Sequence, residues 1–259
     1  MFCHFNYRYL PSLLVATLLL PGCVSSSGPD EKQVAPPTVR EADAFGVTGE
    51  STSLEKKNPA PLLPSALFPG EAKEFVAWRC TPAQDLVSAA TPRKLRLWSG
   101  QGAYRLEPAV VASGARYVKA DLSFWNKGKE ATVESDKGRL RCEQDETRKV
   151  LTRRQRPDVM FHGRGNEPGW TVRLASDRPR LALMLDYGER EIDAAYRVTS
   201  LDNDAGRVTL ESARKDLPFT LSLEGRACFD AMSGEPYPAR VTLRLDGKTY
   251  RGCGQGIAP

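Results

Sequence analysis

The chain has 259 residues, enough for one large folded domain or two small ones. Its net charge of +5 is not gathered into a basic stripe interleaved with aromatics, so we expect no nucleic-acid partner. It contains only two histidines and has no Ser/His/Asp arrangement, metal-ligand cluster or phosphate-binding loop. We therefore expect a protein that is not an enzyme and that needs no cofactor or metal.

Residues 1–22 are typical of a bacterial export signal. Their apolar core, residues 10–20, follows a basic flank and is too short to span a bilayer. The end of this segment, in which Gly22 directly precedes Cys23, resembles the lipobox of bacterial lipoproteins. The resemblance implies cleavage after Gly22, a lipid on Cys23 and, because Val24 rather than Asp follows, an outer-membrane anchor facing the periplasm. An ordinary secretory signal with an incidental cysteine is the alternative.

Two further segments have the composition of connectors. Residues 23–70 are rich in Ser, Pro, Gly, Glu and Ala and have no sustained periodicity, which predicts a disordered tether behind the lipidated cysteine. Fully extended, this tether would span on the order of 150 Å and hold the folded part away from the membrane. Residues 146–156 are strongly basic, and we favour a solvated linker there over a segment that binds anionic lipid or glycan.

The remaining residues form two β-rich stretches, 71–145 and 157–259. Runs such as Glu74–Trp78 in the first and Ala239–Leu245 in the second alternate polar and apolar residues with a period of two, and glycines separate the runs. No longer window has a convincing helical face. Short strands at this spacing predict an all-β chain, with two small antiparallel barrels or sandwiches.

Four cysteines remain for the folded part once Cys3 has left with the signal and Cys23 carries its lipid. In an oxidising compartment they form two disulfides, and none has the spacing of a zinc site. Three pairings are open to four cysteines, and we choose the simplest, with one bridge in each β-rich stretch. The predicted disulfides are Cys80–Cys142 and Cys228–Cys253.

Two polar groups beside glycines stand out in the first stretch: the hydroxyl of Ser113, before Gly114, and the ammonium of Lys127, before Gly128. The Lys127-Gly128 pair lies between two alternating runs and predicts a two-residue hairpin loop. On one straight strand Ser113 and Lys127 would lie roughly 45 Å apart, so a common site requires a bend, for which residues 118–121 are the best place. Without that site, a turn serine and a solubilising lysine are the simpler account.

Residues 75–142 resemble the family of membrane-bound inhibitors of C-type lysozyme, which are eight-stranded β-barrels of bacterial lipoproteins. The elements that carry the resemblance are Ser113-Gly114-Ala115-Arg116-Tyr117, Phe124-Trp125, Lys127-Gly128 with Glu130-Ala131, and the bracketing Cys80 and Cys142. The resemblance implies C-type lysozyme as the partner, with Ser113 and Lys127 entering its active-site cleft. The lysozyme-binding residues are then Ser113, Lys127, Gly114, Arg116 and Tyr117. Within this set we expect Tyr117 to pack inside the barrel and Arg116 to fix the loop, with a direct contact by Arg116 as the alternative.

The charge of the first stretch bears on this partner. Residues 71–145 contain thirteen basic and ten acidic residues, a net charge of +3. Because C-type lysozymes are cationic, long-range steering would be weak or repulsive unless an acidic patch faces the enzyme. The candidates for that patch are Glu134, Asp136, Glu143, Asp145 and Glu146.

The second stretch resembles a family of uncharacterised bacterial envelope domains. The residues that carry this resemblance are 165–170, 228–234 with Tyr237-Pro238, and Gly252-Cys253-Gly254. It implies a β fold and no activity. A small-molecule or glycan site could be lined by His162, Glu167, Trp170 and Asp230. Turn residues around a core tryptophan are the interpretation we favour.

These features lead us to expect an outer-membrane lipoprotein that inhibits C-type lysozyme and so protects peptidoglycan. The alternative is a non-inhibitory envelope lipoprotein, structural or glycan-binding, for which peptidoglycan itself would be a partner.

Overall fold

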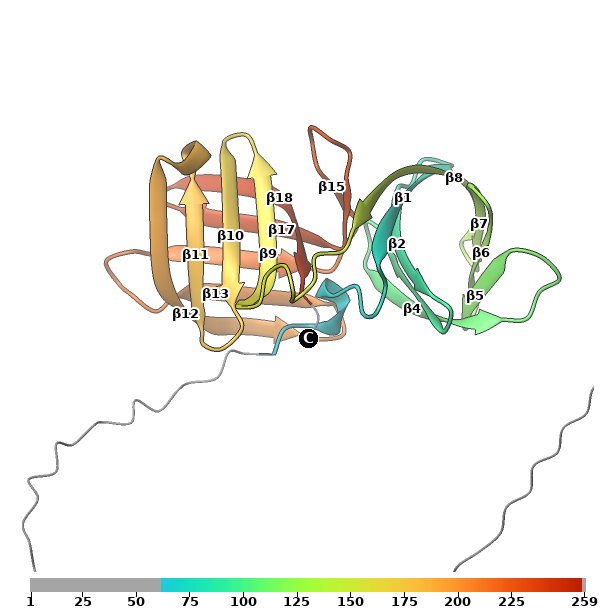
Figure 1. Ribbon diagram of the computed structural model, residues 1–259, viewed down its shortest axis with the longest axis horizontal. Helices are drawn as coiled ribbons and strands as arrows, with labels where there is room; N and C mark the ends of the chain where they lie inside the picture. The colour runs from blue at the N-terminus through green and yellow to red at the C-terminus, as the bar shows by residue number, and fades with distance from the viewer. Residues whose placement is uncertain (1–61, 258–259) are drawn as a thin grey trace, which may run out of the picture. The chain divides into compact units, whose positions relative to one another are not determined.

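The structure, a computed structural model, describes residues 62–257. It is all-β, as the sequence predicted, and contains two closed antiparallel barrels of eight strands each (Figure 1). The export signal, Cys23 and the predicted tether up to residue 61 lie outside the described residues. Within residues 62–257, no helix is long and apolar enough to cross a membrane.

The first barrel is a simple meander in which each strand pairs with the next and the last closes on the first. Its strands are β1 (Glu74–Thr81), β2 (Leu86–Thr91), β3 (Lys94–Trp98), β4 (Ala103–Ala109), β5 (Ala115–Lys119), β6 (Leu122–Lys127), β7 (Glu130–Ser135) and β8 (Gly138–Lys149). Alternate residues point inward, and the Trp78 ring packs edge-on against Phe124, 5.4 Å between centroids. The disulfide Cys80–Cys142 joins β1 to β8 at the closing seam.

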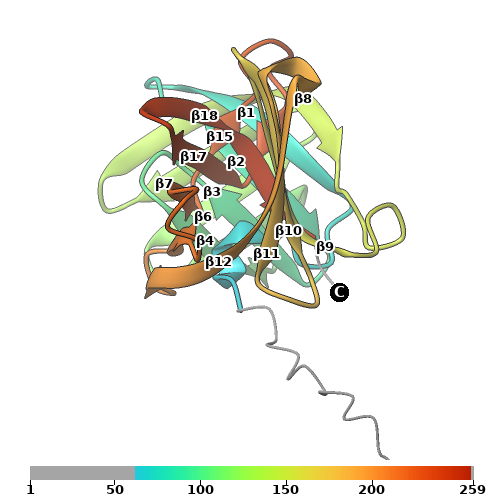
Figure 2. The same cartoon turned by 90° about the vertical axis from the view of Figure 1, so that its left-hand side faces the viewer.

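The second β-rich stretch is a barrel with the same meander, closed where β18 pairs with β9. Its strands are β9 (Val159–Asn166), β10 (Gly169–Ala175), β11 (Arg180–Leu185), β12 (Arg190–Asp202), β13 (Arg207–Ser212), β14 (Phe219–Glu224), β17 (Ala239–Leu245) and β18 (Lys248–Gly256). A 3-10 turn, η2 (Asp186–Gly188), lies between β11 and β12. Three strands separate β11 from β17 in either direction around the closed order, so they lie on opposite walls (Figure 1 and Figure 2).

A small two-stranded sheet interrupts the second meander between β14 and β17. It consists of β15 (Cys228–Phe229) and β16 (Pro236–Tyr237). The disulfide Cys228–Cys253 ties this sheet to β18. Both predicted disulfides are therefore present, one in each barrel.

The end of the predicted tether is folded, which corrects the prediction for residues 62–70. This segment, which we call the strap, contains the 3-10 turn η1 (Ser65–Leu67). Leu63 and Leu67 are buried in the core of the second barrel, although they precede the first barrel in sequence. The Ser-, Pro- and Gly-rich composition of residues 23–61 led us to extend the tether over this short apolar segment, whose burial outweighs the low order expected of the residues before it.

The strap also contacts the first barrel. The indole N–H of Trp98 donates a hydrogen bond to the carbonyl of Ala66, with a nitrogen–oxygen distance of 2.7 Å. The Arg96 guanidinium donates to the carbonyl of Ser65 at 2.6 Å. The strap is thus held on both sides, by hydrogen bonds from β3 side chains to its backbone carbonyls and by the apolar core of the second barrel.

The predicted basic linker, residues 146–156, begins inside a strand, because β8 continues to Lys149. The expectation of a solvated segment is wrong for Arg148, whose side chain is buried between the rings of Phe75 and Tyr237. Its guanidinium donates to the carbonyl of Pro236 at 2.9 Å and to the side-chain oxygen of Gln255 at 2.8 Å. A charge in a basic run is normally solvated, but stacking and two hydrogen bonds offset part of the cost of its burial here, while Nη2 has no hydrogen-bond partner among the described residues.

Candidate functional site

One end of the first barrel gathers the residues that the sequence singled out. In an antiparallel meander, alternate turns fall at the same end, so the turns after β2, β4 and β6 lie together. The turn after β4 contains Ser113, and the turn after β6 follows Lys127. The turn after β7, which contains Lys137, lies at the opposite end.

The bend that a common site requires is present. β5 and β6 form a hairpin in which Lys119 pairs with Leu122, so the chain reverses within the predicted residues 118–121. Ala115 lies opposite Asn126 in this hairpin, which brings the end of the β4–β5 loop level with Lys127. Ser113 and Lys127 are therefore neighbours in space and both are exposed.

Gly114 permits this close approach. A Cβ added to it would lie 2.3 Å from the Asn126 carbonyl oxygen and 2.9 Å from Cγ of Lys127, and its φ is +72°. Any other residue would both collide with β6 and adopt a strained backbone. The Ser-Gly pair in the sequence is thus explained by how closely the loop packs on β6.

Trp125 connects the two polar groups. Its indole N–H donates a hydrogen bond to the Ser113 carbonyl at 3.0 Å, and the Lys127 ammonium lies 3.8 Å from the centroid of its ring. The hydrogen bond fixes the loop, and the cation–π contact orients the lysine. The sequence indicated Trp125 only as part of a strand, because this role depends on which residues the hairpin register places beside it.

The turn after β6 differs by one position from the prediction. Lys127 is the last residue of β6 and pairs with Glu130, so the two turn residues are Gly128 and Lys129. Gly128 has the positive φ, +65°, that the sequence assigned to it. Lys127 therefore projects from the end of a paired strand, which holds its backbone more firmly than a turn position would.

Tyr117 and Arg116 support the barrel on either side of β5. Tyr117 is buried in the core, and its hydroxyl donates to the Thr91 carbonyl at 3.1 Å. Burial raises the pKa of Tyr117, so it stays protonated and keeps this hydrogen bond. Arg116 donates to the Ser123 hydroxyl at 3.2 Å and so ties β5 to β6 rather than to the loop.

The candidate acidic patch is partly neutralised by nearby arginines. Glu134 forms an ion pair with Arg139 at 2.5 Å, and Asp145 forms one with Arg79 at 2.6 Å. All four side chains are at least one-third exposed, so each pair is weak, but the paired carboxylates attract a distant cation less. The first barrel thus remains a cationic body overall.

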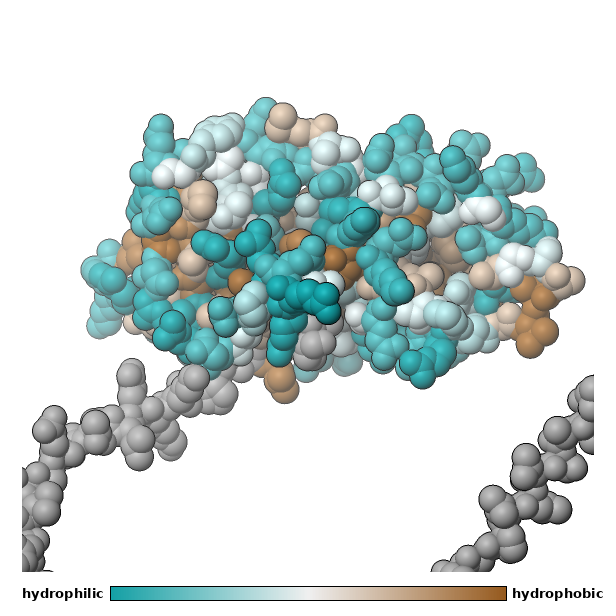
Figure 3. Space-filling view, in the orientation of Figure 1, coloured by the Kyte–Doolittle hydropathy of each residue, from teal (hydrophilic) through white to brown (hydrophobic). Residues whose placement is uncertain are grey.

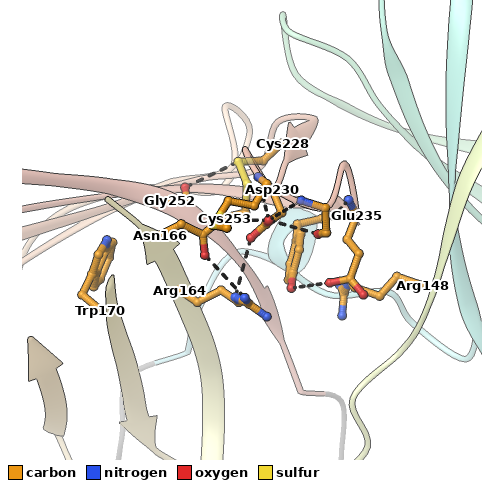
Figure 4. A network of polar contacts seen from close by, with 12 residues as sticks. Arg148, Arg164, Asn166, Trp170, Cys228, Asp230, Glu235, Gly252 and Cys253 are labelled. Atoms are coloured by element: carbon orange, nitrogen blue, oxygen red, sulfur yellow. Dashed lines mark hydrogen bonds and ion pairs between the residues drawn. A yellow bond between two sulfur atoms is a disulfide. The ribbon is translucent and has the colours of Figure 1, made fainter. Parts of the chain in front are cut away.

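The candidate residues of the second barrel serve its own structure (Figure 4). Trp170 is buried, and its indole N–H donates to the Arg251 carbonyl at 3.2 Å. The Asp230 carboxylate accepts hydrogen bonds from Asn166 at 2.9 Å and from the Ser233 amide at 2.9 Å. Burial alone would raise the pKa of Asp230, but these hydrogen bonds outweigh it and the pKa is lowered.

His162 and Glu167 do not complete a site with these residues. His162 lies in β9 opposite Arg173 and Gln255, and Glu167 lies in the exposed turn between β9 and β10. Burial, together with surrounding arginines, lowers the pKa of His162 to about 4, so it is neutral at pH 7. Across residues 62–257, no cluster of three or more His, Cys, Asp or Glu side chains could hold a metal ion.

Comparison with known families gives a match within the barrel that carries Ser113 and Lys127. Residues 78–140 match the family described as membrane-bound lysozyme-inhibitor of c-type lysozyme. No curated protein matches the chain. The family match supports a role in lysozyme inhibition, a C-type lysozyme as partner and a location in the cell envelope.

Proposed function

We propose that the first barrel inhibits a C-type lysozyme by placing Ser113 and Lys127 in the active-site cleft. The observation that carries the proposal is the Trp125 contact, which holds both residues side by side at one exposed end of the barrel. Because loop and strand are already fixed there, binding would order few additional groups. A projecting end with two hydrogen-bonding groups is complementary to a concave cleft lined by carboxyl groups.

The chemistry of glycoside hydrolysis makes these two groups effective. Lysozyme needs one carboxyl group that stays protonated as the acid and a second that is ionised. The Lys127 ammonium beside the acid would lower its pKa and so remove the proton that the leaving oxygen requires. The Ser113 hydroxyl would donate a hydrogen bond to the ionised carboxylate, while the loop excludes the glycan chain.

A lysozyme turnover assay with the full chain tests the proposal. We expect inhibition by the wild-type protein at or below micromolar concentration. Replacing both groups, Ser113→Ala with Lys127→Ala, should raise the inhibition constant at least about 100-fold, because two hydrogen bonds to charged groups are lost. Lys137→Ala is the matched control, since it removes a hairpin lysine at the opposite end of the same barrel.

The possible outcomes distinguish the proposed function, inhibition of lysozyme, from the proposed mechanism, insertion of Ser113 and Lys127. Absence of inhibition by the wild-type protein would contradict the proposed function. Inhibition that survives the double substitution, or that Lys137→Ala weakens equally, would leave the function but exclude the mechanism. Retention of wild-type protein on purified peptidoglycan, without inhibition, would favour the non-inhibitory alternative.

We further propose that Cys23 carries a lipid that anchors the protein in the outer membrane, with the barrels in the periplasm. The support comes from the apolar segment ahead of Gly22-Cys23, in which the cysteine directly follows a small residue. Labelled palmitate supplied to expressing cells should enter the wild-type protein and the Cys3→Ser control but not Cys23→Ser. Equal labelling of Cys23→Ser would contradict the anchor.

A further inference from the structure

The loop between β4 and β5 exposes apolar side chains directly before Ser113. The residues are Val110, Val111 and Ala112, which follow the last residue of β4 and which we call the apolar loop. Val110 is fully exposed, at 103%, the highest value among the large apolar residues of the described chain. Figure 3 shows this loop as brown surface at the right-hand end of the molecule. Single exposed apolar residues are common, but here three consecutive apolar residues, of which Val110 and Ala112 are exposed and Val111 is half-buried, directly precede Ser113.

We propose that the apolar loop is a hydrophobic anchor that packs against the rim of the lysozyme cleft and adds to the affinity. This inference rests on the proposed function, because it names what the same site buries in its partner. The anchor is distinct from Ser113 and Lys127, which act on the catalytic carboxyl groups.

Charge is the first argument for an apolar anchor. Residues 71–145 have a net charge of +3, and the carboxylates of Glu134 and Asp145 are already paired with arginines. Two cationic proteins repel one another at long range, so affinity has to come from contacts that act only at short range. Burial of apolar surface is such a contact and is insensitive to the sign of either charge.

Geometry is the second argument. Ala109 pairs with Arg116 at one end of the loop, and the Trp125 indole holds the Ser113 carbonyl at the other. Val110 is three residues from Ser113, so the two lie within about 10 Å of each other. If Ser113 enters the cleft, Val110 must touch its rim. The loop is short and fixed at both ends, and Val110 is β-branched, so its ordering costs little on binding.

This mode of binding predicts an unusual response to salt. Screening weakens the repulsion between the two cationic proteins and leaves apolar burial intact. The association rate with a C-type lysozyme should therefore rise between 20 mM and 300 mM NaCl. An association rate that falls over this range would overturn the proposal, because it would mean that attraction between opposite charges drives binding.

Substitution of Val110 in the full chain tests the anchor directly. Val110→Thr keeps the shape and should raise the inhibition constant about 10-fold, and Val110→Asp should raise it at least about 30-fold. The aspartate carboxylate attracts a cationic enzyme at long range, so long-range electrostatics would favour binding by this variant. A loss of affinity would therefore report on the apolar contact that a carboxylate cannot make. Met232→Asp is the matched control, since Met232 is 76% exposed and belongs to the second barrel.

The results distinguish the anchor from the proposed function. Unchanged inhibition by Val110→Asp, with inhibition lost in the Ser113→Ala and Lys127→Ala double variant, would overturn the anchor alone. Absence of inhibition by the wild-type chain would overturn both. A wild-type dimer that Val110→Asp dissociates would also overturn the anchor, because a second copy of the chain would then be its partner.

Discussion

Trp125 lies at the centre of the candidate site although it is not itself one of the groups expected to touch the enzyme. Its indole N–H holds the Ser113 carbonyl, and its ring lies under the Lys127 ammonium. One side chain of β6 thus couples the loop between β4 and β5 to Lys127, the last residue of β6. Positioning of this kind sets how much freedom the two groups lose on binding.

Trp125→Phe separates the two contacts. Phenylalanine keeps a ring beneath Lys127 but cannot donate to the Ser113 carbonyl, so the loop is released while the lysine stays oriented. Loss of one hydrogen bond of about 1 kcal/mol should raise the inhibition constant about 5-fold. Titration of lysozyme activity with each protein measures the effect.

Tyr187→Phe is the matched control for this substitution. It also removes a hydrogen bond from an aromatic side chain to a backbone carbonyl, that of Asn166, but in the second barrel. Inhibition by this control should equal that of the wild type. Equal losses in the two variants would exclude a specific role for Trp125.

At the scale of single residues, the sequence identified those that carry their own chemical signal. Ser113, Gly114 and Lys127 form recognisable dipeptides, and Tyr117 lies at an inward position of an alternating strand. Arg148 could not be identified in this way. Its burial depends on Phe75 and Tyr237, which reach it only when both barrels have folded.

The strands are the elements that the sequence predicted best. Period-two alternation reports a local property, namely which face of a strand is buried, and it needs no knowledge of the partner strand. Register is different, because it depends on pairing. The turn after β6 was therefore misplaced by one residue, although its glycine was correctly recognised.

The strap is the element that composition concealed. It follows a long segment rich in Ser, Pro and Gly, but Leu67 is fully buried and belongs to the core of the second barrel. Leu67→Ala should lower the free energy of unfolding of that barrel by about 2–4 kcal/mol, measured by urea denaturation. Lysozyme inhibition at 25 °C should stay unchanged, because Leu67 does not belong to the core that surrounds Tyr117.

Leu62→Ala provides the control in the same segment. Leu62 is 88% exposed, so its truncation should change the free energy of unfolding by less than about 0.5 kcal/mol. A similar small change for Leu67→Ala would mean that the strap adds nothing to the stability of the second barrel.

Over the whole described chain, the two barrels share a mixed set of junction contacts. An apolar cluster joins Phe75 and Trp98 of the first barrel to Ala227, which follows β14 of the second. Arg148 at the end of β8 and Gln255 in β18 add a buried hydrogen bond. The sequence predicted two domains and a linker, but it could not predict this junction, since none of these residues forms a local pattern.

The strap determines where mechanical force enters the folded chain. A pull on the polypeptide ahead of Leu62 reaches Leu63 and Leu67 first, and these are seated in the second barrel. Ser65 and Ala66, which lie between these two leucines, pass part of that tension to Arg96 and Trp98 of the first barrel. Trp98 is the last residue of β3 and therefore lies toward the end of the barrel opposite the turns after β4 and β6, so a load on the N-terminal side does not act directly on Ser113 and Lys127. The segment on which such a load acts and the end that carries Ser113 and Lys127 are in this way mechanically separated within a single chain.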